Sequence, residues 1–263
     1  MPAKGATTIR PEAAVHTPPG FEAPAAVRLS GVSRAYPTRR GSVAALDGLS
    51  LHARPREVVA VVGPSGCGKS TLLELICGLQ LPDAGTVESP PAVYMPQRDL
   101  LLPWSTALDN AALPLLVARV RRSEARRRAR PLFAELGLGG FESAMPHELS
   151  GGMRQRVAFL RTLLAGRPVL ALDEPFAALD ALTRAQAQAW LAGALAREPR
   201  TVVLVTHDVE EAVVLGDRVV VLSPRPGRAL AELDVALPRP RRRTDPDVVA
   251  LRERALEALE AAR

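Results

Sequence analysis

The sequence has few cysteines, few aromatic residues and no long hydrophobic run. Only 2 of its 263 residues are Cys, too few for a disulfide framework or a cysteine-rich zinc site. Aromatic residues make up 3%, which leaves few rings for stacking on bases. Its apolar stretches are broken by Pro, Gly or charge before the roughly 18–20 residues that a membrane-spanning helix needs. The N-terminus also lacks a hydrophobic signal core, so we expect a globular protein that stays in the cytosol.

Lysine is also scarce, although the chain is basic. Of the 34 lysine and arginine residues, only Lys4 and Lys69 are lysine. The net charge of +6 raises the question of an anionic partner. Much of the excess charge lies in two arginine runs, at residues 119–130 and 238–243. We favour a solvated helix face for these runs over a contact with an anionic partner, and we expect no nucleic-acid partner.

The pattern changes along the chain and divides it into segments. Residues 1–25 are rich in Ala, Pro and Thr without periodicity, which predicts a disordered extension. Residues 26–243 alternate short apolar runs with helical patterns, which predicts an α/β core with a mainly parallel sheet. Between about 100 and 166 only helical periodicity is found, which predicts an inserted helical subdomain. Asp245 followed by Pro246 is typical of a helix start, so 244–263 is predicted to form a C-terminal helix.

Four continuous apolar runs predict strands that are buried on both faces, and longer segments between them predict crossover helices. The predicted strands are Val58–Val62, Val169–Leu172, Val202–Val205 and Val219–Leu222. The predicted helices are Ser70–Leu79 and Ala181–Ala196.

The first motif directly follows the strand at 58–62. It fits G-x-x-x-x-G-K-[ST] and reads Gly63-Pro64-Ser65-Gly66-Cys67-Gly68-Lys69-Ser70-Thr71. Its glycines let backbone N–H groups surround phosphate oxygens, and the following helix N-terminus favours negative charge. Lys69 supplies a compact cation for the β- and γ-phosphates, and Ser70 supplies a hydroxyl for Mg²⁺. The alternative is an ordinary Gly-rich turn. We interpret Cys67 as a small filler whose alkylation would block phosphate binding.

The second motif is a pair of carboxylates at the end of the strand at 169–172. In a parallel sheet this edge binds ligands. Asp173 is expected to hold Mg²⁺ through water, and Glu174 is expected to polarise an attacking water. The alternative is a capping pair after a strand.

The third motif is Ser150-Gly151-Gly152, which precedes a helical run to Leu164. Unpaired backbone N–H groups at this helix start would form a second anion site. Taken alone, the motif also fits an ordinary N-cap.

Together the three motifs resemble those of ATP-binding-cassette (ABC) ATPases, in which the segment beginning at Leu149 matches the signature sequence. The resemblance covers residues 27 to about 241. It implies a P-loop NTPase core with a mainly parallel sheet, an N-terminal antiparallel β subdomain and an inserted helical subdomain. It also implies ATP and Mg²⁺ as ligands.

The resemblance assigns roles to four further residues. It implies that Tyr36 stacks on adenine and that Gln97 contacts Mg²⁺ and the attacking water. Asp180 matches a loop that crosses the dimer interface, and His207 matches a histidine near the γ-phosphate. Glu174, His207 and Gln97 are therefore the expected catalytic residues, and Ser70, Gln97 and Asp173 the expected metal ligands.

The sequence departs from the family pattern at three places. Met153 stands where many members have Gln, and Ala177 where Ser is common. The segment 85–92 is short for the antiparallel stretch that precedes Gln97.

The resemblance implies a head-to-tail homodimer, in which each ATP lies between the Lys69 loop of one copy and the Ser150 segment of the other. The stretches 97–104, 222–228 and 237–241 resemble importers of the nitrate, sulfonate and taurine group, which includes relatives for pyrimidine precursors of thiamine. We therefore expect separate membrane permease subunits docked near Gln97, a periplasmic or lipid-anchored solute-binding protein, and a position on the cytoplasmic face of the membrane. One alternative is an exporter, lipoprotein-release or cell-division complex; another is a soluble ABC ATPase acting on nucleic acid or ribosomes.

Overall fold

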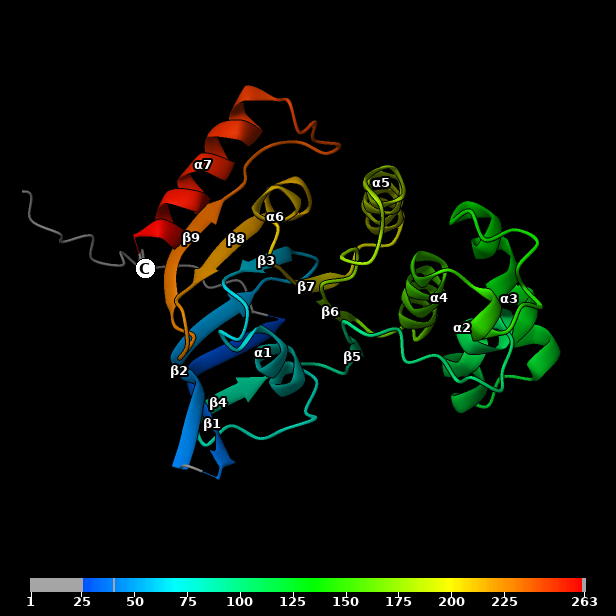
Figure 1. The fold of residues 1–263 in the computed structure, drawn as a ribbon, viewed down its shortest axis with the longest axis horizontal. Coiled ribbons are helices and arrows are strands. Elements are labelled where there is room, and N and C mark those ends of the chain that lie inside the picture. Colours follow the sequence, from blue (N-terminus) through cyan, green and yellow to red (C-terminus); the bar gives the residue numbers. More distant parts are fainter. Residues whose placement is uncertain (1–25, 40, 262–263) are drawn as a thin grey trace, which may run out of the picture.

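The computed structural model describes residues 26–39 and 41–261, so the predicted extension at 1–25 lies outside the described residues. The chain forms two sheets, and helices cover them (Figure 1). The smaller sheet is antiparallel and has the order β2-β1-β4. Its strands are β1 (Val27–Thr38), β2 (Gly41–Ala53) and β4 (Ala84–Glu88). The antiparallel β subdomain that the resemblance implies is therefore confirmed.

The larger sheet has six strands in the order β5-β6-β7-β3-β8-β9. Neighbouring strands are parallel except β9, which pairs antiparallel with β8. The strands are β3 (Val58–Val62), β5 (Ala92–Met95), β6 (Val169–Asp173), β7 (Thr201–Thr206), β8 (Arg218–Leu222) and β9 (Ala229–Asp234). Every residue of β3, β6, β7 and β8 is buried, which confirms the four strands expected from apolar runs.

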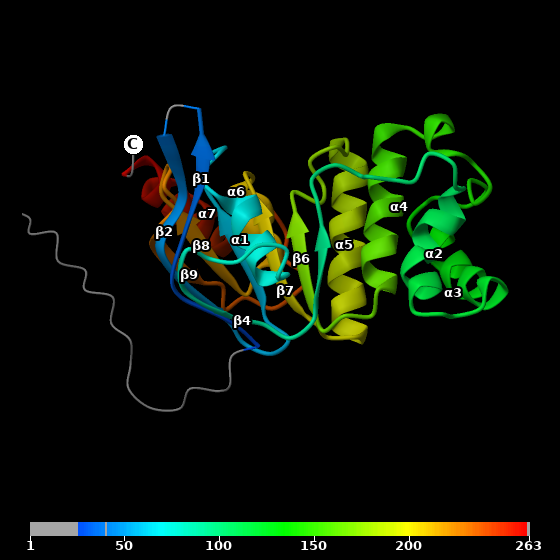
Figure 2. The ribbon, with the colours of Figure 1, turned by 90° about the horizontal axis from the view of Figure 1, so that it is seen from below.

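Helices pack on both faces of the large sheet, and the regular elements between β5 and β6 are all helices. They are α1 (Lys69–Ile76), α2 (Ala107–Val117), α3 (Arg122–Glu135), the 3₁₀ helix η1 (Pro146–Glu148), α4 (Gly151–Leu164), α5 (Ala181–Arg197), α6 (Val209–Leu215) and α7 (Pro246–Glu260). Figures 1 and 2 place α2 and α3 at one end of the molecule, with α4 between them and the large sheet. Among the described residues, none of the helices combines the length and apolarity needed to cross a bilayer.

Buried aromatic side chains join the helical segment to the sheet. Phe159 of α4 packs edge-on against Phe176, with ring centroids 5.8 Å apart, and against Trp190 of α5 at 5.7 Å. Phe133 of α3 belongs to the same apolar cluster as Leu172 of β6. Burying each such ring contributes about 1.5–3 kcal/mol, so the helices between β5 and β6 are held by the core that also holds the site.

Helix α1 ends at Ile76, three residues earlier than the sequence pattern suggests. Gly78 takes the left-handed conformation, with φ 67°, and its N–H donates to Leu75 O. The N–H of Leu79 donates to Glu74 O at 2.9 Å, which completes a Schellman motif. Because the helix stops here, the Leu79 side chain lies on the surface and is 62% exposed.

The first arginine run lies on α3 and forms local ion pairs. Arg122 and Arg126 both contact Asp109 of α2, at 2.6 and 2.7 Å. The guanidinium of Arg126 and then that of Arg122 hold the pKa of the Asp109 carboxyl well below its usual range. The charges of this run therefore connect α3 to α2 within the chain.

The expectation of a solvated helix face is wrong for the second run, which lies between β9 and α7 and is not helical. The Arg241 side chain is only 2% exposed. It donates to the carbonyl oxygens of Val213 at 2.8 Å and Val235 at 3.0 Å, and also to that of Gly216. The carbonyls of Val213 and Gly216 lie at the end of α6, where a planar guanidinium with several fixed donors can satisfy them together. Burial lowers the pKa of Arg241 to about 10, so its charge is retained at neutral pH.

We predict that Arg241→Ala lowers the free energy of unfolding by about 3 kcal/mol, because several buried carbonyls lose their donor at once. The adjacent Arg242 is exposed, so Arg242→Ala is a matched control that should stay within about 0.5 kcal/mol of wild type. Urea unfolding followed by circular dichroism measures both. Equal stabilities for the two variants would contradict the structural role of Arg241.

Candidate active site

The predicted phosphate loop connects β3 to α1 at the carboxyl end of the strand. Gly68 has φ 102°, and a Cβ there would lie 2.6 Å from Ala45 O and 2.7 Å from Leu46 Cδ2. Only glycine therefore fits this position. The first turn of α1 has no side-chain cap and no acidic residue. The uncapped backbone N–H groups of this turn thus indicate that an anion is their partner.

The loop holds its lysine inside. Lys69 is buried, and its Nζ donates to Gly63 O at 2.7 Å and to Pro64 O at 3.0 Å. An ammonium group has three donors, so one donor remains for a ligand in the loop. The loop thus combines a fixed point charge with uncapped N–H groups, which is the chemistry that a phosphate group needs.

Cys67 is buried within the phosphate loop. Its side chain is 1% exposed, and a Cβ on Gly63 would lie 2.8 Å from its Sγ. Burial raises the pKa of the thiol, and nearby Lys69 acts in the opposite direction. The filler role is consistent with this packing. Because the thiol is buried and its pKa is raised, alkylation of Cys67 should be slow, and the expectation that an adduct there blocks phosphate binding stays a prediction.

Asp173 lies at the end of β6 beside the phosphate loop. Its Oδ2 accepts a hydrogen bond from the hydroxyl of Tyr94 at 3.0 Å. Burial raises the pKa of Asp173, and hydrogen bonds from Ser70 and Tyr94 act in the opposite direction. Within the described part of the chain, no group of three His, Cys, Asp or Glu side chains could hold a metal ion. The hard oxygens of Ser70 and Asp173 suit Mg²⁺, which in proteins uses few carboxylates together with phosphate oxygens.

The three expected catalytic residues meet at one oxygen atom. Gln97 Nε2 donates to Glu174 Oε2 at 3.0 Å, and His207 Nδ1 lies 3.1 Å from the same Oε2. Gln97 follows β5, Glu174 follows β6 and His207 follows β7. Glu174 takes the left-handed conformation with φ 46°, a strained state for a non-glycine residue. The strain directs this carboxylate toward the groups on both sides.

Tyr36 reaches the same region from β1. Its hydroxyl donates to Gln80 Oε1 at 2.9 Å and lies 3.2 Å from Thr71 Oγ1, at the start of α1. The guanidinium of Arg34 lies 5.2 Å from the centroid of its ring, in cation–π range. The Tyr36 side chain is therefore fixed beside the phosphate loop.

The signature segment does not join this cluster. Ser150 is the N-cap of α4, and its side chain accepts from Met153 N at 3.2 Å. Helix α4 packs on α2, α3 and β5, whereas the phosphate loop lies between β3 and α1. A Cβ on Gly152 would lie 3.1 Å from Leu179 Cδ2, so this helix start borders the loop that ends at Asp180. Asp180 in turn caps α5 by accepting from Thr183 N at 3.0 Å.

Sequence reasoning missed the contribution of Tyr94. The sequence places Tyr94 only three residues before Gln97, and the parallel pairing of Tyr94 with Ala171, two residues before Asp173, is what brings its hydroxyl to that carboxylate. The pattern also did not reveal the ion pair of Arg154 with Asp99, at 3.0 Å, which joins the signature helix to the segment after Gln97.

The fold and these residues match known proteins. The model of the ABC transporter family matches residues 46–177. The chain belongs to this family, has the ABC ATPase fold, and binds and hydrolyses ATP.

Curated relatives are similar over most of their length. The aliphatic sulfonates import ATP-binding protein SsuB 1 of Agrobacterium fabrum is 42% identical, over 96% of this chain and 94% of the relative. The taurine import ATP-binding protein TauB of Rhizobium johnstonii is 45% identical over 74% and 78%. The formylaminopyrimidine import ATP-binding protein ThiZ of Halalkalibacterium halodurans is 46% identical over 72% and 78%.

Solved structures show the same architecture. The ATP-binding cassette MJ0796, a dimer in a post-hydrolysis state with ADP and Pi, superimposes with a TM-score of 0.74. It is 30% identical, and the match covers 80% of this chain and 99% of that chain.

We predict that Lys69→Ala weakens ATP binding about 10- to 100-fold, because the charge-assisted contacts to phosphate are lost. Lys69→Arg should bind nearly as poorly, since a planar guanidinium does not fit between Gly63 O and Pro64 O. Fluorescent-nucleotide titration measures the affinity, and a thermal melt verifies folding. Tight binding by Lys69→Ala would argue against the phosphate-loop role.

Proposed function

We propose that this chain is the ATP-hydrolysing subunit of an importer that acts as a head-to-tail homodimer on the cytoplasmic face of a membrane. The contact of Gln97 and His207 with one oxygen of Glu174, beside the Lys69 loop, carries the hydrolytic part of this proposal. The sequence identities of 42–46% to import ATP-binding proteins support import as the direction of transport. They favour an importer over an exporter, lipoprotein-release or cell-division complex.

Each side chain has a defined part in hydrolysis. Lys69 and the uncapped N–H groups of α1 bind the phosphates. Glu174 accepts a hydrogen bond from the attacking water and orients it, while Gln97 and His207 fix the carboxylate on either side. Mg²⁺ held by Ser70, Asp173 and Gln97 would neutralise charge on the phosphate oxygens. Tyr36 is proposed to contact the adenine.

The signature segment completes the site from the second copy. Ser150 to Gly152 lie at a helix start away from the Lys69 loop of the same chain. A head-to-tail dimer would place them over the phosphates of the partner, where uncapped N–H groups favour an anion. Asp180 is proposed to lie at that interface. The dimeric MJ0796 cassette supports this arrangement.

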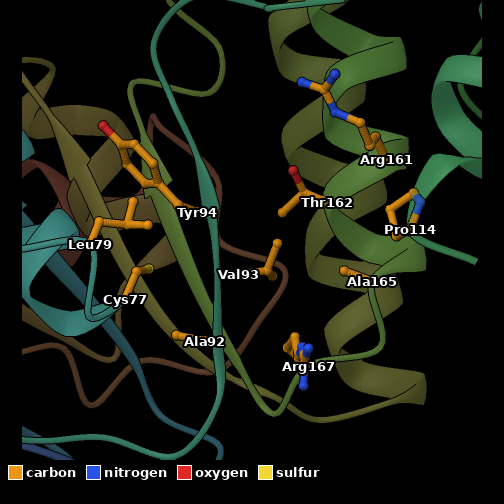
Figure 3. A pocket seen from close by; sticks show the side chains of 10 residues that line it. All are labelled: Cys77, Leu79, Ala92, Val93, Tyr94, Pro114, Arg161, Thr162, Ala165 and Arg167. Atoms are coloured by element: carbon orange, nitrogen blue, oxygen red, sulfur yellow. The ribbon is translucent and has the colours of Figure 1, made fainter. Parts of the chain in front are cut away.

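A groove beside Gln97 is our proposed docking site for the membrane permease. It has a volume of about 350 Å³ and opens between β5 and the end of α1 on one side and α4 and α2 on the other (Figure 3). Apolar side chains line part of it, among them Leu79, which is 62% exposed, and Val93. Arg161 of the groove donates to the carbonyl oxygens of Asp99 at 2.6 Å and Leu100 at 2.9 Å. A partner in the groove would thus contact the segment that carries Gln97.

The solute is proposed to be of the kind that the relatives import, a small sulfonate such as taurine or a pyrimidine precursor of thiamine. A solute-binding protein would deliver it to the permease. The domain organisation is proposed to be an ABC ATPase domain at 26–243, with its helical subdomain at about 100–166, and a C-terminal helix at 244–263.

We predict that Glu174→Gln retains ATP binding but hydrolyses ATP at least about 100-fold more slowly, because the amide keeps the contacts and loses the basic oxygen. The stalled protein should form an ATP-dependent dimer in size-exclusion chromatography with light scattering. Isolation of this variant with Mg-ATP from native membranes should also recover a polytopic permease. Hydrolysis near the wild-type rate would remove Glu174 from its assigned role, and recovery of ribosomal or nucleic-acid partners without a permease would overturn the importer.

We predict that Leu79→Glu abolishes permease recovery while ATP binding is unchanged, since it buries a charge in an apolar contact. Leu230→Glu is the matched control, because Leu230 is also exposed but lies on β9. The assay is co-purification with the permease, quantified for both variants. Equal recovery with both variants would exclude the groove as the docking site.

A further inference from the structure

Arg184, in the first turn of α5, lies between two loops that the proposed function uses. Its backbone N–H donates to Asp180 O at 2.8 Å, and its Nη2 donates to Leu179 O at 3.1 Å. The side chain therefore folds back under the loop that ends at Asp180. Its Nη1 lies 3.7 Å from Asp208 Oδ2, in the turn that carries His207. One guanidinium thus contacts both the proposed interface loop and the catalytic turn.

Asp208 sets the shape of the His207 turn. Its backbone N–H donates to Thr206 Oγ1 at 3.0 Å, and its Oδ1 accepts from Glu211 N at 3.1 Å as the cap of α6. The other oxygen, Oδ2, faces Arg184. The position of this carboxylate therefore depends on both the helix start and Arg184, and His207 is the adjacent residue.

These contacts form a closed path through the catalytic carboxylate. From Glu174, whose carbonyl oxygen accepts from Ala177 N at 3.2 Å, the chain turns to Leu179. Arg184 connects Leu179 to Asp208, and the preceding residue, His207, contacts Glu174 Oε2 at 3.1 Å. A displacement of the loop at 177–180 would therefore move the His207 turn through Arg184.

A second carboxyl, that of Glu211, lies near Arg184 but does not compete with Asp208 for its charge. Glu211 is 4% exposed, and burial raises its pKa to about 8, so it is mostly neutral at pH 7. Across the described residues 26–39 and 41–261, Arg184 Nε and Glu211 Oε1 have no hydrogen-bond partner. The ion pair with Asp208 is thus the charged contact of the Arg184 guanidinium. Its length of 3.7 Å allows the two side chains to move closer together.

We propose that Arg184 is a positioning residue that connects the loop at 177–180 to the His207 turn, so that dimer contacts at Asp180 adjust the His207–Glu174 pair. The proposal rests on the proposed function, which places Asp180 at the interface. In this proposal Arg184 acts through Asp208 and has no direct role in binding ATP or the attacking water.

Arg184→Ala tests the connection, with Arg197→Ala as the matched control from the last turn of the same helix. In the full-length chain, we expect Arg184→Ala to lower the kcat of Mg-ATP hydrolysis about 10- to 100-fold, since a misplaced group near the chemistry has this cost. The KM, the nucleotide affinity measured in the Glu174→Gln background and the melting temperature should stay at their wild-type values. A kcat equal to that of Arg197→Ala, or a parallel fall in affinity and melting temperature, would overturn the proposal.

A double-mutant cycle tests whether Arg184 acts through Asp208. Asp208→Asn keeps an acceptor for Glu211 N and removes the charge that faces Arg184. We expect the double variant to be no slower than the slower single variant. Losses that multiply would show that the two residues act separately and would refute the connection.

A spectroscopic readout separates this proposal from the proposed function. The chain has 4 His, so the imidazole C–H resonances of His207 can be assigned by comparison with His207→Ala. They should shift in both Arg184→Ala and Asp208→Asn and stay in place in Arg197→Ala. Unchanged resonances in Arg184→Ala would overturn the connection. A wild-type chain that does not hydrolyse ATP would overturn the proposed function, while the resonances would still decide the role of Arg184.

Discussion

The site depends on the parallel pairing of β5, β6, β7 and β3. Because these strands run in one direction, the segments that follow them emerge at one edge of the sheet. Gln97, Glu174 and His207 follow three different strands, yet they meet at one oxygen atom, and the Lys69 loop follows a fourth strand at the same edge. Strands buried on both faces cannot slip by one residue without losing buried apolar contacts, so the core fixes the height of each catalytic residue.

Local patterns sufficed to predict four strands of the large sheet and the loop, whereas the antiparallel sheet was expected only from the family resemblance. Tertiary contacts account for what the local patterns missed. The run at 58–62 and the motif after it predict a strand, a turn and a helix start, because valine runs and glycine spacing act locally. The contact of Gln97 and His207 with one oxygen depends on strand order, which a sequence does not encode locally. The burial of Arg241 was unforeseen for the same reason, since its acceptors lie on α6 and after β9.

The imbalance between arginine and lysine follows from geometry. Half-buried guanidinium groups here bind carbonyl oxygens of segments that are distant in the sequence: Arg156 donates to Leu136 O at 2.7 Å, and Arg161 donates to Asp99 O and Leu100 O. A planar group with five donors suits such acceptors, and its charge persists even where burial lowers the pKa. Lys69 has the opposite task, because a phosphate loop has room for one compact charge.

Two series of contacts, each from a different surface of the molecule, end at the oxygen Oε2 of Glu174. On one side Gln97 leads to the segment at 99–100, which Arg154 and Arg161 connect to α4 and to the groove of Figure 3. On the other side His207 leads through Asp208 and Arg184 to the loop before Asp180. Gln97 and His207 contact the Oε2 atom of Glu174, while the Glu174 backbone is held by its N–H to Val205 O and by Ala177 N to its carbonyl oxygen. Under the proposed function, a change at the groove or at the loop before Asp180 would therefore reach the carboxylate that orients water, through Gln97 in the first case and through His207 in the second.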